Sequence, residues 1–171
     1  MRGNVITPII ILILLTSPLL FGFIKGQVTR QVINIKEYAS IGLGITFVFF
    51  AIGHIVKTHG MVEMLPPWVP LRLQLVYATG LLEFAVGIAL FTTKYRELAA
   101  KLAIVIFIVF FPANIYAAFN SIGLGGHQWG PIYLLIRAPL QIILIAWAYF
   151  LCVKTHSSVT MHASANSYLE K

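Results

Sequence analysis

The chain has 171 residues, of which 59% are hydrophobic and 10% charged, and its net charge is +7. A soluble domain carries about 25% charged and about 45–50% apolar residues, so this composition excludes a water-soluble globule. The basic residues are scattered between apolar segments and form no basic stripe with interleaved aromatic residues, which argues against a nucleic-acid partner. The single cysteine, Cys152, excludes chemistry that needs a pair of thiols within the chain.

Five apolar stretches approach the length of about 20 residues that a helix needs to cross a bilayer. They cover residues 5–24, 38–56, 73–91, 98–119 and 131–152. The runs are continuously apolar and lack the alternation of a membrane β-strand, so they predict helices. We therefore expect an all-α, polytopic membrane helix bundle whose partner is the lipid bilayer.

The first stretch has the composition of either a secretory signal or a retained anchor helix. The FGFIKGQ segment that follows it lacks the small-residue pattern of a cleavage site, which favours retention. The predicted organisation is then an N-terminal transmembrane helix with a basic cytoplasmic loop (1–37), a four-helix membrane domain (38–152) and a disordered cytoplasmic tail (153–171).

The distribution of Lys and Arg predicts the orientation of the bundle, because cytoplasmic loops retain positive charge. One side holds eight of these residues and the other holds three. The eight are Lys25, Arg30, Lys36, Lys94, Arg96, Lys101, Lys154 and Lys171, and the three are Arg2, Lys57 and Arg72. We expect a multi-pass protein of the cell membrane with its C-terminus in the cytoplasm and its N-terminus outside.

Two ionisable residues fall inside predicted spans, where charge is costly and usually faces the bundle interior. Glu83 lies ten residues into its span, about 15 Å deep, and Arg137 lies six residues into its span, about 9 Å deep. His54, Asn114 and Gln141 lie in the same outer half, so the five residues form a predicted ligand-binding layer. The alternative is a structural Glu83–Arg137 ion pair, with Asn114 and Gln141 as hydrogen-bonding links between helices.

Small residues and prolines surround this layer. Thr79, Gly80 and Gly87 flank Glu83 at helical spacing, which would allow a neighbouring helix to approach closely. Pro112 and Pro139 each leave one helical carbonyl without its donor, and such a group needs a partner at membrane depth.

Four residues on the predicted outer side could in principle ligate a metal: His54, His59, Glu63 and His127. His54 and His59 are five residues apart, whereas the two histidines of helical zinc motifs are four apart. We therefore predict no metal site.

The order of several motifs resembles the DoxX-like family of small integral membrane proteins, over residues 41–150. The motifs are GLGITFVFFAIGHIVK, PPWVP, ATGLLEFAVGIALF, FPANIYAAFN and RAPLQIILIAWAYF. The resemblance implies a four-helix core, to which the N-terminal helix is an addition, and Ala138 stands where the family pattern suggests Leu. It also implies that His54, Glu83, Asn114, Arg137 and Gln141 are the family-like polar positions.

The resemblance further implies a link to quinol oxidation and thiosulfate:quinone oxidoreduction, so quinone is the candidate cofactor. The sequence carries no haem, flavin or iron–sulfur motif, so electrons would have to come from a redox partner protein. We expect a non-catalytic or accessory subunit of a quinone-associated oxidoreductase system with a buried polar small-molecule site. The alternatives are a proton-coupled small-molecule carrier, which would need a homo-oligomer, and a non-catalytic assembly or interaction protein.

Overall fold

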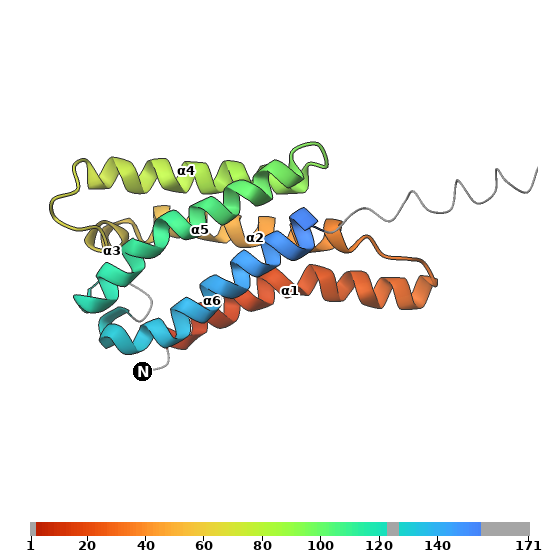
Figure 1. The fold of residues 1–171 in the computed structure, drawn as a ribbon, viewed down its shortest axis with the longest axis horizontal. Helices are drawn as coiled ribbons and strands as arrows, with labels where there is room; N and C mark the ends of the chain where they lie inside the picture. Colours follow the sequence, from red (N-terminus) through yellow and green to blue (C-terminus); the bar gives the residue numbers. More distant parts are fainter. Residues whose placement is uncertain (1–2, 123–126, 155–171) are drawn as a thin grey trace, which may run out of the picture.

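The computed structural model describes residues 3–122 and 127–154, and these ranges contain helices and no strand (Figure 1). The predicted all-α class is confirmed. The tail predicted from residue 153 lies outside the described residues from residue 155 onward. The elements are α1 (Gly3–Thr29), α2 (Ile35–Val56), α3 (Thr58–Glu63), α4 (Arg72–Phe91), α5 (Arg96–Phe119), the 3-10 helix η1 (His127–Tyr133), α6 (Leu134–Trp147) and the π-helical η2 (Ala148–Lys154).

Five helical stretches in the described ranges are long and apolar enough to cross a membrane, which supports the predicted multi-pass bundle. Successive stretches run in opposite directions between two ends of the molecule (Figure 1). The α1–α2 and α4–α5 connections lie at one end, and α3 and η1 lie at the other. The stretches are Ile6–Thr29, Ile35–Val56, Arg72–Phe91, Arg96–Phe119 and Trp129–Lys154.

The last stretch differs from the single helix predicted over residues 131–152, because it is divided into η1, α6 and η2. Gly130 adopts a φ of 70°, a left-handed conformation that glycine tolerates and that redirects the chain before Pro131. Pro139 lies inside α6 and removes one helical hydrogen bond there. The final turns have the wider π geometry, which the hydrophobic pattern does not reveal.

The proline-rich connection before α4 has the irregular backbone that its sequence predicts. The short helix α3 ends at Glu63, ahead of Pro66, Pro67 and Pro70. Leu71, which precedes α4, takes a left-handed φ of 52°. Prolines therefore separate α3 from α4 and leave room for a turn at this end of the bundle.

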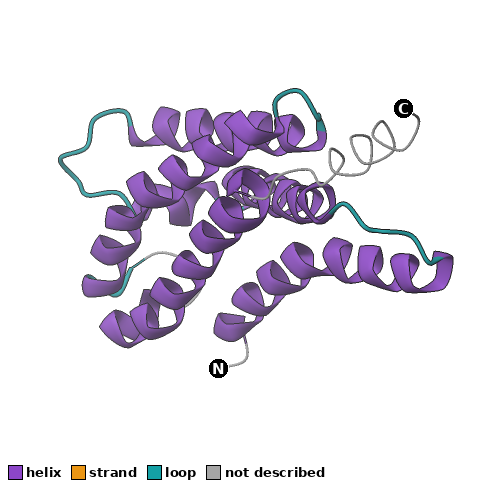
Figure 2. Ribbon diagram, turned by 45° about the vertical axis from the view of Figure 1, so that its right-hand side comes forward, coloured by secondary structure: helices purple, strands orange, loops and turns teal. Residues whose placement is uncertain are grey.

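Helix α1 belongs to the packed structure, because Ile11 and Leu15 are almost completely buried. The helix contains Pro8 and Pro18 and bends partway along its length, as an internal proline predicts (Figure 2). Gly42 of α2 faces the Leu15 backbone so closely that any Cβ would overlap the Leu15 carbonyl oxygen. Close contact between α1 and α2 thus depends on a glycine.

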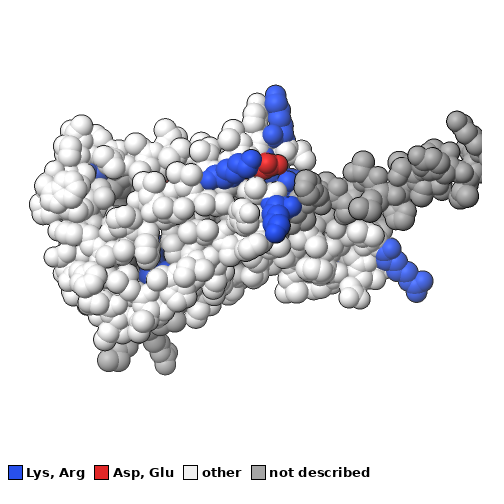
Figure 3. Space-filling view, in the orientation of Figure 1, with Lys and Arg blue, Asp and Glu red and all other residues white. Residues whose placement is uncertain are grey.

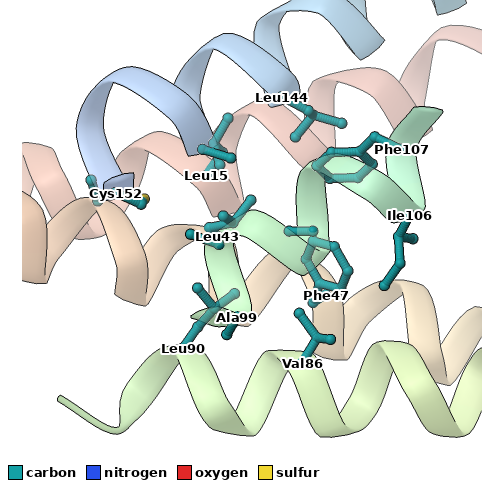
Figure 4. Packing of buried hydrophobic residues seen from close by; sticks show 14 of the residues in the cluster. Leu15, Leu43, Phe47, Val86, Leu90, Ala99, Ile106, Phe107, Leu144 and Cys152 are labelled. Carbon is teal, nitrogen blue, oxygen red and sulfur yellow. The ribbon is translucent and has the colours of Figure 1, made fainter. Parts of the chain in front are cut away.

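The core lies where α2 meets α4, α5 and α6, and it is filled by aliphatic and aromatic side chains (Figure 4). The rings of Phe47 and Phe107 are 5.2 Å apart between centroids. Helices α2 and α4 approach so closely that a Cβ on Gly44 would lie 3.0 Å from the Gly87 carbonyl oxygen. The close helix approach predicted around Glu83 is therefore present, and its partner is α2.

Trp147 links α6 to α2, because its indole nitrogen donates a hydrogen bond of 3.0 Å to the carbonyl oxygen of Ala39. We expect Trp147→Phe to lower the free energy of unfolding by about 1 kcal/mol, the usual net value of such a bond. Chemical unfolding in detergent, followed by circular dichroism, measures the change. Trp68→Phe is the control, because Trp68 is 81% exposed and should change stability little. An equal effect of the two substitutions would contradict this prediction.

Candidate functional site

A buried acid and a histidine meet between α2 and α4. Glu83 is 5% exposed, and its Oε2 lies 3.1 Å from Nε2 of His54. The alternative of a direct Glu83–Arg137 ion pair is not what the structure shows, because Glu83 pairs with His54 and no N···O distance of 4 Å or less joins Glu83 to Arg137 among the described residues. The close approach of α2 to α4 at Gly80 places the His54 imidazole against this carboxyl group.

Backbone and side-chain contacts hold the His54 ring in one orientation. Nδ1 lies 2.8 Å from the carbonyl oxygen of Val76, and 3.4 Å from Oγ1 of Thr79. A carbonyl oxygen only accepts, so Nδ1 carries a hydrogen and donates it. Gly80 makes room for the ring, because a Cβ there would lie 2.6 Å from the Cβ of His54. The other ring nitrogen, Nε2, is consequently the one that faces Glu83.

Arg137 of α6 lies within electrostatic reach of both Glu83 and Tyr133. Its Nε atom is buried and has no hydrogen-bond partner among the described residues. Oε2 of Glu83 is also buried without a hydrogen bond, although it lies at ion-pair distance from Nε2 of His54. The site therefore holds one buried hydrogen-bond donor, on the guanidinium, and one buried carboxyl oxygen, and neither has a hydrogen-bond partner among the described residues.

Asn114 and Gln141 are buried, as expected for a polar layer inside the bundle. Their amide groups, however, donate hydrogen bonds to backbone carbonyl oxygens of α5. Nδ2 of Asn114 donates to the carbonyl oxygen of Phe110, at 3.1 Å and within the same helix. Nε2 of Gln141 donates to the carbonyl oxygen of Phe107 and so joins α6 to α5. The direct contacts bring His54 and Glu83 together, with Arg137 in electrostatic reach, whereas Asn114 and Gln141 have no contact of this kind with Glu83.

Tyr133 is a site residue that the sequence pattern alone does not reveal. Its side chain is 1% exposed and interacts with Arg137 one helical turn later. The i, i+4 spacing of Tyr133 and Arg137 is the sequence feature that indicates their contact. Tyr133 is nevertheless easily taken for an interfacial anchor, because it belongs to η1, near the end of a predicted span, where aromatic residues ordinarily have that role.

A separate pocket of about 410 Å³ opens near the end of the bundle that carries α3. None of the five predicted site residues lines it. His59 and Glu63, two of the four residues weighed as metal ligands, form an exposed pair at 3.3 Å. The side chain of His127 lies outside the described residues, and among those described no three potential metal ligands gather. The pocket is lined by Glu63, Leu65, Pro67, Arg72, Tyr116, Ser121 and Ile122.

Comparison with protein families finds a match to a family model described as a domain of unknown function, DUF8561. It covers residues 43–152, which lie inside the predicted membrane domain and contain all five predicted site residues. Comparison with curated proteins and with solved structures finds no match. The matched range begins within α2, so α1 lies outside it.

Proposed function

This chain belongs to the DUF8561 family, and we propose that its polar site between α2, α4 and α6 binds a small amphipathic molecule of the quinone class. One observation carries the proposal. A buried donor, Nε of Arg137, and a buried oxygen, Oε2 of Glu83, both lack hydrogen bonds among the described residues. Buried polar groups without partners are costly, so their retention at one site favours a ligand that supplies the partners.

The two atoms match the chemistry of a quinone and its reduced form. A quinone carbonyl accepts a hydrogen bond, which the Arg137 guanidinium can donate. A quinol hydroxyl donates one, which the Glu83 carboxylate can accept. The surrounding helices are rich in aliphatic and aromatic side chains, as expected where an apolar ring and tail are held by few polar groups.

We propose an accessory role in a redox-linked membrane system. The sequence has no haem, flavin or iron–sulfur motif, so a partner protein would exchange electrons with the bound quinone. The resemblance to DoxX-like proteins favours the same role. In this role the chain holds the quinone in the bilayer, and the partner carries out electron transfer.

Native mass spectrometry of gently purified protein, followed by solvent extraction, tests the proposal. We expect wild type to retain a quinone and both Glu83→Gln and Arg137→Leu to lose it while remaining folded. Lys94→Gln, which changes an exposed cation in the α4–α5 connection at the opposite end of the bundle, is the control and should retain the ligand. If all four folded proteins come out empty, the buried site has another role and the proposal fails.

The orientation of the bundle is a further proposal, with the basic end in the cytoplasm. Lys and Arg gather near the α4–α5 connection (Figure 3), where Nζ of Lys36 and Nζ of Lys101 lie 3.5 Å and 2.9 Å from Glu97. The positive-inside rule places this end, together with the C-terminus, on the cytoplasmic side of the cell membrane.

Labelling of introduced cysteines tests this orientation. The chain has one cysteine, Cys152, which is buried and can be replaced by Ser to give a background. We expect an impermeant maleimide added to intact cells to label Lys57→Cys, and to label Lys94→Cys only after the membrane is opened. Both positions are exposed. The opposite labelling pattern would reverse the proposed topology.

A further inference from the structure

The polar site has an unbalanced charge, which bears on the kind of ligand it accepts. The chain has five acidic residues: Glu37, Glu63, Glu83, Glu97 and Glu170. Glu37 and Glu97 are in the first turns of α2 and α5, and Glu63 ends α3. Glu83 is therefore the one acid in the interior of a described span, and the described residues place no second carboxylate there to neutralise Arg137.

The contact between Glu83 and His54 requires a proton. Since Nδ1 of His54 donates to Val76, a neutral imidazole would present the lone pair of Nε2 to Glu83. A lone pair and an ionised carboxylate 3.1 Å apart in a buried site would repel each other. One of the two groups must therefore be protonated, and the pair as a whole is neutral whichever group holds the proton.

Arg137 stays charged, because a guanidinium does not lose its proton in proteins. The groups that bear on the site are His54 from α2, Glu83 and Thr79 from α4, Arg137 from α6 and Tyr133 from η1. Thr79 and Tyr133 are uncharged in their ordinary forms. The site as a whole thus carries one positive charge inside the bundle, where an isolated charge is expensive.

We infer that the site binds its amphipathic ligand as a single oxyanion, neutralising the charge of Arg137. The inference rests on the proposed function, since it specifies the ionisation state of the ligand at the same site. Nε of Arg137 is an unpartnered buried donor for the oxyanion. The shared proton can move between Glu83 and His54 without changing the charge of the site.

Two matched ligand pairs separate charge from shape. The first pair is an alkyl hydroxynaphthoquinone, which is an acid ionised at neutral pH, and its methyl ether, which is not. The second is a long-chain carboxylate and the alcohol of the same chain length. Dissociation constants are measured in detergent by quenching of tryptophan fluorescence. We expect the anionic member of the preferred pair to bind at least about tenfold more tightly, as charge-assisted hydrogen bonds predict. If the naphthoquinone pair binds more strongly, the oxyanion belongs to a quinone. If the long-chain pair binds more strongly, it belongs to a fatty acid.

Two variants distinguish charge balance from a simple loss of contacts. His54→Gln removes the shared proton and leaves ionised Glu83 to neutralise Arg137, so the preference for the anion should disappear. Glu83→Gln leaves a neutral His54 beside charged Arg137, so the preference should remain even though overall affinity falls. His59→Gln, at an exposed histidine, is the control and should behave as wild type.

The wild-type comparison decides the inference even if a variant fails to fold. Equal binding of a charged and an uncharged partner by wild type overturns the inference and leaves the proposed function intact. A preference for the uncharged partners also overturns it. Binding of none of the four compounds overturns both the inference and the proposed function.

Discussion

Gly42→Ala is expected to detach α1 from the bundle, although it adds a single methyl group. A Cβ at this position would overlap the Leu15 carbonyl oxygen and lie 3.0 Å from the Leu15 carbonyl carbon. Both are backbone atoms of a helix, so no side-chain rotation relieves the overlap. Ile11 and Leu15 would then lose their burial in the core. We expect the free energy of unfolding to fall by about 3 kcal/mol, the upper part of the usual range for overpacking.

Thermal unfolding in detergent measures this loss, and a cysteine cross-link between α1 and α2 reports whether the helices still meet. Gly53→Ala is the matched control in the same helix. A Cβ there would meet the flexible end of Met61 at 3.3 Å, which can shift at little cost. If Gly42→Ala unfolds at the wild-type temperature with an unchanged cross-link, the described packing of α1 is wrong.

Arg137→Leu is expected to make the protein more stable while it removes ligand binding. Among the described residues no carboxylate lies within ion-pair distance of Arg137, and its Nε is buried without a hydrogen bond. Replacement of a buried ion pair by apolar side chains often stabilises a protein, by about 1–4 kcal/mol, and we expect the same direction for this single charge. A residue that costs stability and is nevertheless present is more consistent with a role in binding than with a structural link.

Unfolding of ligand-free wild type and variant in the same detergent checks this expectation, since bound ligand would itself stabilise the wild type. Lys57→Leu is the control, because it removes an exposed cation and should change stability by less than about 0.5 kcal/mol. A clear loss of stability in Arg137→Leu would show that the guanidinium is part of the structural framework. The charge of Arg137 would then serve the fold and would require no anionic ligand.

The sequence predicts which residues belong to the candidate site, but it does not predict which of them contact one another. A charged or strongly polar residue within an apolar span is visible without a structure, and Glu83 and Arg137 were found in this way. Their depths alone suggested that they meet. The structure pairs Glu83 with His54, because Gly80 lets the imidazole approach α4 and the Val76 carbonyl orients it. Such contacts depend on how each helix is rotated about its axis, which depth does not define.

The chain by itself determined the helical class and the five membrane-length stretches. Bilayer thickness sets the length of a span, and an apolar environment requires every backbone group to be bonded within its own helix. Only the tertiary structure decided the contact of α1 with Gly42 and the partner of Glu83. These features arise between residues far apart in sequence, where the close approach of two backbones selects which side chains can meet. Spacing along one helix carries no information about that approach.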